Sequence, residues 1–402
     1  MIFTVPLEHE STISNHFYSL SISGSRKTKD FTFHAFYILD SLKRKQSLHK
    51  TSFDGFYQIN KEILETIISK KYRLQIVRYL VSIGLIEVNH SYSTINHTSK
   101  GYRLTALANL SKWGQVTIKD RLLIYKLENW EKKLQSDTNK RIAKKGGGYQ
   151  ITNYWLNEIR ISNDVFKELE TVNNDVKKDA YLMQIERINK GKMFRVIDIN
   201  NRFHHNLTNL KREFRKYLTI EGQPLKSIDI IASQPTFLAI LLDRLSNKSN
   251  DDFTNELNNY KRVLNENDFY EHLNGSDFIN DEQRKQFKER FFSSVLFGKA
   301  SNMDTKIGKL FKHEFPLIFE AIKKLKARNG TNYIANSLQQ IESLFIFNLI
   351  NHIDTLTGSK SIPLVSLHDA IYTTENNIDT VDMLSFEYSQ KVTSSLIKFK
   401  PE

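Results

Sequence analysis

The chain of 402 residues contains no cysteine, which excludes disulfide frameworks, thiolate zinc sites and a cysteine nucleophile. No stretch approaches the roughly 18 uninterrupted apolar residues of a membrane span, and the first ten residues lack a basic segment followed by an apolar core. Acidic residues are also scarce, since 45 Asp and Glu face 58 Lys and Arg for a formal net charge of +13. We therefore expect a soluble, cytoplasmic protein without a membrane partner that binds a polyanion, with nucleic acid as the leading candidate.

The apolar spacing between residues 29 and 107 predicts three amphipathic helices followed by a β-hairpin. The helices are expected at residues 31–42, 61–69 and 74–83, and the strands at 85–89 and 102–105 around a tip at 90–100. Lys70 to Arg73 would separate the second and third helices, and Gly84 would cap the third. This arrangement resembles a winged-helix domain.

Winged helices place one helix in the major groove of DNA and basic side chains on phosphates. The candidate contacts are Lys70, Lys71, Arg73 and Arg78. The alternative is that this segment binds another protein and that its basic residues only face water. The sequence favours neither reading over the other.

Residues 110–148 continue with a basic, helical pattern that ends in Lys144-Lys145-Gly146-Gly147-Gly148. Consecutive glycines are costly in a regular element, so we expect a hinge or a loop facing nucleic acid there, with Lys144 and Lys145 as contacts. Residues 247–281 are rich in Asn and Asp, which predicts a partly mobile insertion. The predicted domains are 1–110, 111–195 and 196–402, of which the first is winged-helix-like and the second is a helical linker or thumb-like region.

Two short acidic motifs, at residues 227–234 and 363–370, each place an aspartate at or just past the end of an apolar, β-branched run. Mg²⁺ prefers hard oxygen ligands, and two strand-borne carboxylates suit a pair of metal ions about 3.5–4 Å apart, as in nucleotidyl transfer. Asp229 and Asp369 are therefore predicted to hold two Mg²⁺ ions, with Mn²⁺ as an alternative.

Further matches appear around these aspartates, and with them the last 200 residues resemble the palm and fingers of the DNA polymerase I family, family A. In family order the matching segments are Arg202 to Leu210, Asp229 with Ser233-Gln234, residues 267–273, Arg284 with Lys288 and Phe292, Asn336 with Gln340, and His368-Asp369. The resemblance implies an α+β right-hand polymerase with an antiparallel palm sheet and helical fingers.

The resemblance also implies roles for these residues. Arg284 and Lys288, four apart on one helix, would hold the triphosphate of the incoming nucleotide, while Phe292 would pack on its sugar and Gln234 would lie beside it. Phosphate recognition favours such a pair of a forked guanidinium and an ammonium. Primer and template would contact Arg202, Asn336 and Gln340. Asp229, Asp369 and His368 would form the catalytic group, with His368 orienting the primer end.

The sequence departs from the family pattern in three places. Two extra residues separate Asp229 from Ser233-Gln234, and Ala370 stands where the family has a glutamate after the aspartate. The glutamate that follows the Gln in DNA-making members is also missing, since residues 235–237 are Pro, Thr and Phe. The choice between deoxyribose and ribose therefore stays open.

The sequence as a whole predicts a template-directed nucleotidyltransferase, a family A-like DNA polymerase that replicates a mobile or viral element. It would extend a 3′ end on DNA, or on RNA, with nucleoside triphosphates. One alternative is a primase or single-subunit RNA polymerase that uses the same palm. The other is a non-catalytic winged-helix protein that binds DNA and initiates replication.

Overall fold

The computed structural model describes residues 1–22, 31–48, 55–59, 61–89, 101–173, 175–246, 251–266 and 268–402. The chain divides into a first unit, Met1–Asp137 with Leu169–Gln184, and a second unit, Thr138–Glu168 with Ile185–Glu402. Helices predominate and the strands pair antiparallel, which agrees with the expected α+β class. None of the helices described is long and apolar enough to cross a membrane.

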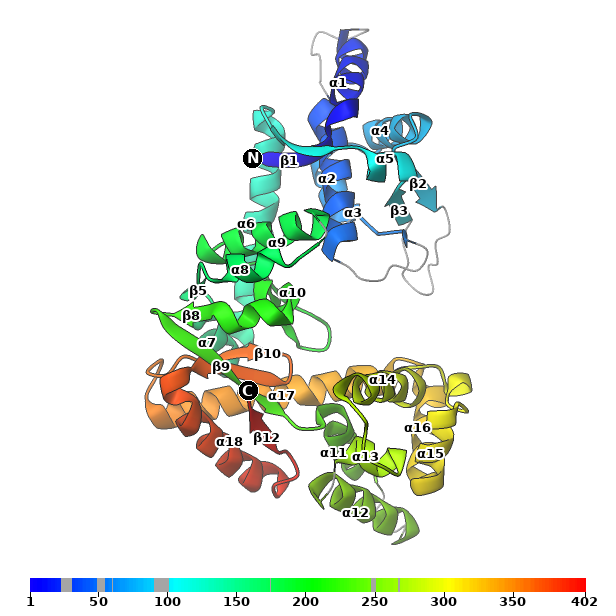
Figure 1. The fold of residues 1–402 in the computed structure, drawn as a ribbon, viewed down its shortest axis with the longest axis vertical. Helices are drawn as coiled ribbons and strands as arrows, with labels where there is room; N and C mark the ends of the chain where they lie inside the picture. The colour runs from blue at the N-terminus through cyan, green and yellow to red at the C-terminus, as the bar shows by residue number, and fades with distance from the viewer. Residues whose placement is uncertain are drawn as a thin grey trace. The chain divides into compact units, whose positions relative to one another are not determined.

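The first unit consists mainly of helices; in Figure 1 its segment 1–137 runs from blue to cyan, and its segment 169–184 is green. Its elements in chain order are β1 (Ile2–Pro6), α1 (Leu7–Ile22), α2 (Thr32–Leu48), α3 (Lys61–Ile67), α4 (Lys70–Ser82), β2 (Ile86–Asn89), β3 (Gly101–Leu104), α5 (Ala106–Leu110), β4 (Trp113–Thr117), the beginning of α6 (Arg121–Lys145), the end of α8 (Val165–Glu170) and the beginning of α9 (Asp175–Asn189).

Helices α2, α3 and α4 precede the antiparallel pair β2–β3, in which Ile86 lies opposite Leu104. Gly84 follows α4 with a φ of +72°, as expected of a residue just past a helix end. The predicted break at Lys70 to Arg73 is wrong, because α4 begins at Lys70 and the interruption falls at the extended Ser69. The predicted hairpin tip, residues 90–100, lies outside the described residues.

A strand interrupts the segment that was expected to be helical throughout. β4 pairs antiparallel with β1, so that Phe3 lies opposite Val116. The helical pattern begins after it, in α6. Five residues are too few for their apolar pattern to identify a strand. The strand that pairs with β4, β1, lies near the start of the chain and gives no local signal.

The second unit combines a sheet with a larger number of helices. Its elements in chain order are the end of α6, α7 (Gly147–Trp155), β5 (Ile159–Ile161), the beginning of α8, the end of α9, β6 (Arg195–Ile197), β7 (Phe203–His205), α10 (Asn206–Asn209), η2 (Arg212–Tyr217), β8 (Leu218–Ile220), β9 (Gln223–Ile230), α11 (Ser233–Leu245), α12 (Asp251–Glu266), α13 (Phe269–Asn274), α14 (Asp281–Phe291), η3 (Phe292–Leu296), η4 (Ala300–Asn302), α15 (Lys306–Glu314), α16 (Pro316–Asn329), α17 (Tyr333–Thr357), β10 (Val365–Leu367), β11 (Ala370–Thr374), η5 (Glu375–Asn377), α18 (Ile378–Thr393) and β12 (Phe399–Pro401).

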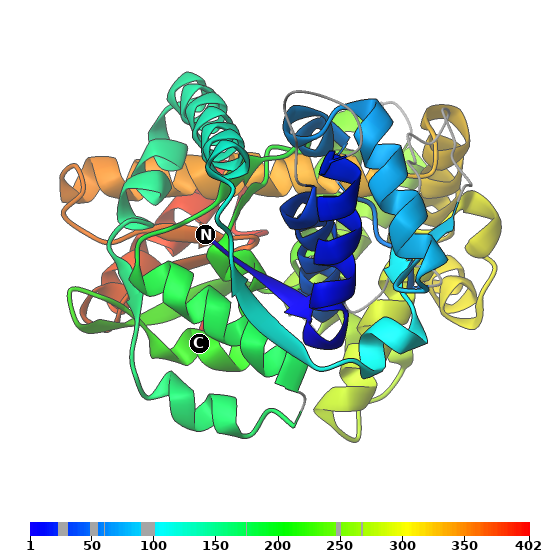
Figure 2. The same cartoon turned by 90° about the horizontal axis from the view of Figure 1, so that it is seen from above.

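The sheet of this unit has the order β10-β11-β9-β8-β5, and β12 adds to the free edge of β9. Its strands are short and carry buried β-branched residues, such as Ile228, Ile230 and Ile371. Helix α17 lies alongside β10 and β11 in both views (Figures 1 and 2) and contacts them. The sheet and α17 thus form the support for the side chains considered below.

The hinge predicted at Gly146 to Gly148 is not what the structure shows, because two of these glycines belong to α7. Gly147 and Gly148 form its first turn, and a Cβ atom on Gly148 would lie 2.1 Å from the backbone oxygen of Phe347 in α17. Tyr149 stacks on the ring of Phe347 with centroids 3.6 Å apart. The glycine therefore permits close helix packing and does not form a hinge.

Much of the segment 247–281, for which a partly mobile insertion was predicted, forms the packed helices α12 and α13. Asn and Asp occupy the outer face of α12, while Leu257, Tyr260, Val263 and Leu264 are buried at helical spacing. The polar composition concealed an amphipathic pattern. Residues 247–250 and 267 lie outside the described residues.

Candidate active site

The two aspartates of the acidic motifs lie on neighbouring strands. Asp229 stands near the end of β9 and is the register partner of Ala370 in β11. The backbone nitrogen of Ile230 donates a hydrogen bond to the carbonyl oxygen of Asp369 over 3.3 Å. The structure therefore brings Asp229 and Asp369, 140 positions apart in sequence, to the same end of two paired strands.

Asp369 belongs to the connection between β10 and β11. Leu367 pairs with Ala370, so His368 and Asp369 form a two-residue turn. His368 has a φ of +58°, a conformation that tight hairpins require and that a residue with a Cβ adopts at a cost. Backbone strain is thus held in the turn that presents Asp369.

The charges around Asp229 oppose one another. The pKa of Asp229 is raised to about 6, chiefly by burial and also by the negative charges of Asp369 and Glu402, while Arg212 and Lys288 act in the opposite direction. A partly buried carboxylate beside a second one favours any added positive charge, whether a proton or a metal ion. The site is therefore suited to bind a cation.

The donor set fits a magnesium ion better than a closed structural metal site. No group of three or more His, Cys, Asp or Glu side chains with metal-binding geometry occurs in the described part of the chain. Two carboxylates are sufficient for Mg²⁺, which keeps several water ligands and takes others from substrate phosphates. Asp229 and Asp369 would supply the protein ligands.

Helix α14 carries two cations towards this acidic pair. The guanidinium carbon of Arg284 lies 5.3 Å, and the ammonium nitrogen of Lys288 5.9 Å, from the centre of the Tyr270 ring. Lys288 also lies 5.6 Å from the ring centre of Phe292. Aromatic faces at such distances attract cations. The charge of Lys288 lowers the pKa of Asp229, so this lysine acts electrostatically on one of the two aspartates.

Arg284 has a carboxylate partner that the sequence did not reveal. Its Nη2 donates to Oδ2 of Asp268 over 2.6 Å, while Oδ1 of Asp268 accepts from the backbone nitrogens of Tyr270 and Glu271 at the start of α13. Phe292, predicted on the same helix, lies just beyond α14 in the π-helix η3. Asp268 therefore fixes the orientation of Arg284.

A buried carboxylate, Glu342 of α17, links three segments beside the aspartates. It is 1% exposed and accepts from Nε and Nη2 of Arg202 over 3.0 and 2.6 Å. Its other oxygen accepts from Nε2 of Gln234 over 2.6 Å. Burial raises the pKa of Glu342 to about 7 despite the opposing charge of Arg202. Arg202 and Gln234 are thus held in one network with a residue that sequence reasoning missed.

The raised pKa of Glu342 predicts a pH dependence of stability. Because the folded protein holds this proton up to about pH 7, whereas an ordinary glutamate loses it near 4.5, the folded state binds more protons in that interval. The free energy of unfolding of the wild type, measured relative to Glu342→Gln, is expected to fall as pH rises from 4.5 to 7. Urea unfolding at several pH values checks this, and a pH-independent difference would contradict it.

Two histidines near the turn, His368 and His205, are kept neutral because burial lowers the pKa of each. Burial lowers the pKa of His368 to about 4, and its ring lies 5.9 Å from that of His204. His205, which the sequence reasoning passed over as a site residue, is fully buried, and its Nε2 lies 2.8 Å from the carbonyl oxygen of Ser366 in β10. His205 therefore supports the strand that leads into the His368-Asp369 turn.

The two residues predicted on α17, Asn336 and Gln340, have different surroundings. Nδ2 of Asn200 donates to Oδ1 of Asn336 over 3.1 Å and to Oε1 of Gln339 over 2.8 Å. Gln340 is exposed. Helical spacing alone did not distinguish Gln339 from Gln340, because the partner, Asn200, lies in a distant loop.

The other predicted nucleic-acid contacts lie on two helices. Lys70, Arg73 and Arg78 belong to α4 of the first unit, where Lys70 and Arg78 are exposed and Arg73 lies 3.6 Å from Glu65. The side chain of Lys71, on the same helix, lies outside what the structure describes.

Lys144 and Lys145 end α6 in the second unit. Lys144 is exposed, and Nζ of Lys145 donates to Oδ1 of Asn201 over 2.7 Å. Neither residue lies in a hinge, since α7 begins directly after Gly146.

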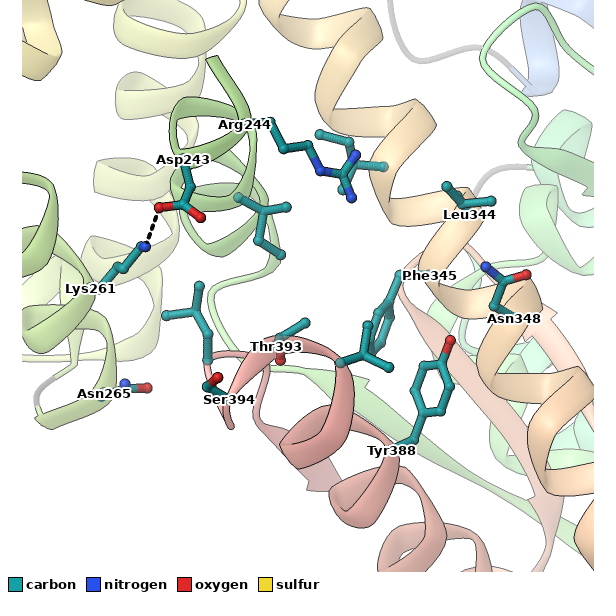
Figure 3. A pocket seen from close by; sticks show the side chains of 14 residues that line it. Asp243, Arg244, Lys261, Asn265, Leu344, Phe345, Asn348, Tyr388, Thr393 and Ser394 are labelled. Atoms are coloured by element: carbon teal, nitrogen blue, oxygen red, sulfur yellow. Dashed lines mark hydrogen bonds and ion pairs between the residues drawn. The ribbon is translucent and has the colours of Figure 1, made fainter. Parts of the chain in front are cut away.

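A pocket of about 420 Å³ lies elsewhere in the second unit, between α11, α12, α17 and α18 (Figure 3). Its wall combines apolar side chains with Arg244 and with the ion pair Asp243–Lys261, whose Oδ1 and Nζ lie 2.7 Å apart. None of the site residues predicted from the sequence lines it. The pocket is thus separate from the acidic pair.

Comparisons with known proteins leave the site to be interpreted from its own geometry. No family model matches the chain, and no curated protein matches it. Among solved structures the chain is similar to the POL domain of Pol1 from M. smegmatis, which was solved in complex with DNA primer-template and dNTP. The TM-score is 0.39 and the identity 12%, over 100% of this chain and 66% of that one. A likeness at this level carries no argument about activity.

Proposed function

We propose that the protein is a template-directed nucleotidyltransferase, a DNA polymerase that extends the 3′ end of a nucleic-acid strand. The observation that carries the proposal is the convergence of Asp229 and Asp369 at the end of two paired strands, where the charge of Lys288 of α14 also acts on Asp229. Carboxylates for a metal and a cation for phosphate are the groups that this chemistry needs.

The two aspartates would hold a pair of Mg²⁺ ions, for which Mn²⁺ could substitute. When bound, the ions lower the pKa of the attacking hydroxyl and neutralise the charge that develops on the phosphates. Asp229 and Asp369 would fix the ions between their strands. His368, neutral because burial lowers its pKa, can position the sugar at the primer end without adding charge. Little covalent work is left to the protein, so positioning supplies most of the rate.

The incoming nucleoside triphosphate would lie against α14. Lys288 would contact its phosphates, and Arg284, oriented by Asp268, would add a forked donor. Phe292 offers an aromatic face for the sugar, and Gln234 is held near the site through Glu342. Arg202, Asn336 and Gln340 would contact primer and template.

The first unit would anchor the enzyme to DNA. The order of three helices and a hairpin resembles a winged helix, and the exposed Lys70 and Arg78 of α4 could contact phosphates. Such a pairing of modules suits replication of a mobile or viral element. Deleting residues 1–137 is expected to weaken DNA binding, which a gel-shift titration can measure.

Primer extension with separate nucleotide pools tests the proposed function. The wild type is expected to incorporate dNTPs on a primed template in the presence of Mg²⁺. Incorporation of rNTPs, or synthesis without a primer, would instead support an RNA polymerase or primase, which the absence of a glutamate at residues 235–237 leaves open. DNA binding without incorporation from any pool would support a non-catalytic initiator.

Lys288→Ala is expected to raise the KM for the nucleoside triphosphate by roughly 10- to 100-fold, because a charge-assisted contact to phosphate contributes about 1.5–3 kcal/mol. Steady-state kinetics on a fixed primer–template measures the change. Lys285→Ala is the matched control, since Lys285 is exposed on the same helix and lies 3.6 Å from Glu282. Equal effects of the two substitutions would contradict the role of Lys288.

A further inference from the structure

Strand β12 places Glu402 on the same face of the sheet as Asp229. Ser227 and Glu402 exchange both backbone hydrogen bonds, over 3.2 and 2.8 Å. On the other edge of β9, Tyr372 is the register partner of Ser227. Opposed residues share a face of a sheet, and so do residues two apart along a strand. Tyr372, Ser227 and Glu402 therefore lie in a row across three neighbouring segments. The row is on the face of the sheet that carries Asp229, two residues before Asp229 along β9.

The 3₁₀-helix η2 packs against β9. Two of its arginines, Arg212 and Arg215, lie near the two ends of this row. Nη2 of Arg212 donates to both carboxylate oxygens of Glu402, over 3.0 and 2.8 Å. Burial raises the pKa of Tyr372 and the charge of Arg215 opposes that rise, so Arg215 lies near the Tyr372 end of the row. Residues three apart in a 3₁₀-helix lie on the same side of it. Arg212 and Arg215, the arginine pair, are thus held side by side next to the aspartates.

The bond to Glu402 determines which carboxylate Arg212 pairs with. The side chain of Arg212 is 75% exposed, and its charge reaches Asp229. Without a partner, an exposed guanidinium so close to a carboxylate would pair with it and occupy the position of a metal ion. The bond to Glu402, whose side chain is 37% exposed, keeps Arg212 off Asp229 and leaves the outer part of the guanidinium in water.

We propose that Glu402 is a positioning residue that holds Arg212 beside the catalytic aspartates, where Arg212 and Arg215 bind a backbone phosphate of the strand being extended. The proposal rests on the proposed function, since it assigns a nucleic-acid strand to this site. Lys400, the register partner of Asp229 on β12, adds an exposed cation to the same face. A phosphodiester fits this place because two forked donors can bind its oxygens together.

The salt dependence of DNA binding tests the role of Arg212. Fluorescence anisotropy of a labelled primer–template duplex, without nucleotides and in EDTA, measures affinity between low and high KCl. Arg212→Gln is expected to weaken binding about tenfold at low salt and to reduce the slope of log K against log salt by about 1. Arg212→Lys should keep the slope. Arg262→Gln is the matched control, since Arg262 is exposed and pairs with Glu266 on α12.

Metal binding tests the role of Glu402. Mn²⁺ affinity, followed by electron paramagnetic resonance, is expected to fall about tenfold in Glu402→Gln, because Arg212 then pairs with Asp229. The double variant Glu402→Gln/Arg212→Gln should return to near the wild-type affinity for Mn²⁺ but not for DNA. Circular dichroism and thermal unfolding verify that each variant is folded, and a reversal of the Mn²⁺ defect in the double variant excludes a merely structural loss.

An unchanged salt slope in Arg212→Gln, or unchanged Mn²⁺ affinity in Glu402→Gln, would overturn the proposal. Both measurements are independent of catalysis. A protein that binds DNA and Mn²⁺ as expected but incorporates no nucleotide would contradict the proposed function alone, whereas an active enzyme with an unchanged slope in Arg212→Gln would contradict the arginine pair alone.

Discussion

Asp369→Ala is expected to lower the rate of nucleotide incorporation by at least about a thousandfold while the protein remains folded. The substitution removes one of the two carboxylates that converge at the ends of β9 and β11, and metal-based stabilisation of the transition state is worth several kcal/mol. Single-turnover primer extension measures the rate. Because Asp369 is a half-buried turn residue and not part of the apolar core, the loss should appear without a matching loss of stability.

Asp277→Ala is the control for this experiment. Asp277 is an exposed aspartate of the same unit, in the loop before α14. It should retain the wild-type rate. If Asp369→Ala kept its activity within a factor of about ten, the aspartate pair could not be the metal-binding centre of the reaction.

Gly148→Ala is expected to lower the free energy of unfolding by about 3 kcal/mol or more. A Cβ at this position would lie 2.1 Å from the backbone oxygen of Phe347, so α7 and α17 would have to separate. In an ordinary helix the same substitution would be favourable by up to about 1 kcal/mol, which makes the sign of the effect diagnostic. Urea unfolding followed by far-ultraviolet circular dichroism measures it.

Lys144→Ala serves as the control for the glycine substitution, because Lys144 is an exposed residue at the adjacent end of α6 and should change stability by less than about 0.5 kcal/mol. A Gly148→Ala variant as stable as the wild type would mean that the two helices are not in such close contact. The Tyr149–Phe347 stacking would then also need revision.

The sequence was informative where a local pattern determines the structure. β-branched runs with an aspartate at or just past the end predicted two strands, and β9, which ends at Ile230, and β10, which ends at Leu367, occur at those positions. The i, i+4 spacing of Arg284 and Lys288 predicted a shared helix face, and both cations do lie over Tyr270. Patterns of this length depend on neighbouring residues alone.

The rest of the site depends on contacts between distant segments. Glu342 sits in the apolar part of a long helix, and only its partners Arg202 and Gln234, more than a hundred positions away, explain a buried carboxylate there. Glu402 reaches the site only through the register of β12 on β9. The glycines of α7 were read as a hinge because the helix that fills the space beside them lies far away in sequence. Local spacing contains none of this information.

Binding of Mn²⁺ tests the central claim, that Asp229 and Asp369 act together as one cation site. Electron paramagnetic resonance titration of the nucleotide-free protein at neutral pH, above the pKa of about 6 of Asp229, should give a saturable signal for the wild type. Asp229→Asn and Asp369→Asn should each weaken binding by at least about tenfold, and the double variant little more than either, as expected of two ligands of one site. Mn²⁺ affinities equal to that of the wild type in both single variants would contradict the claim.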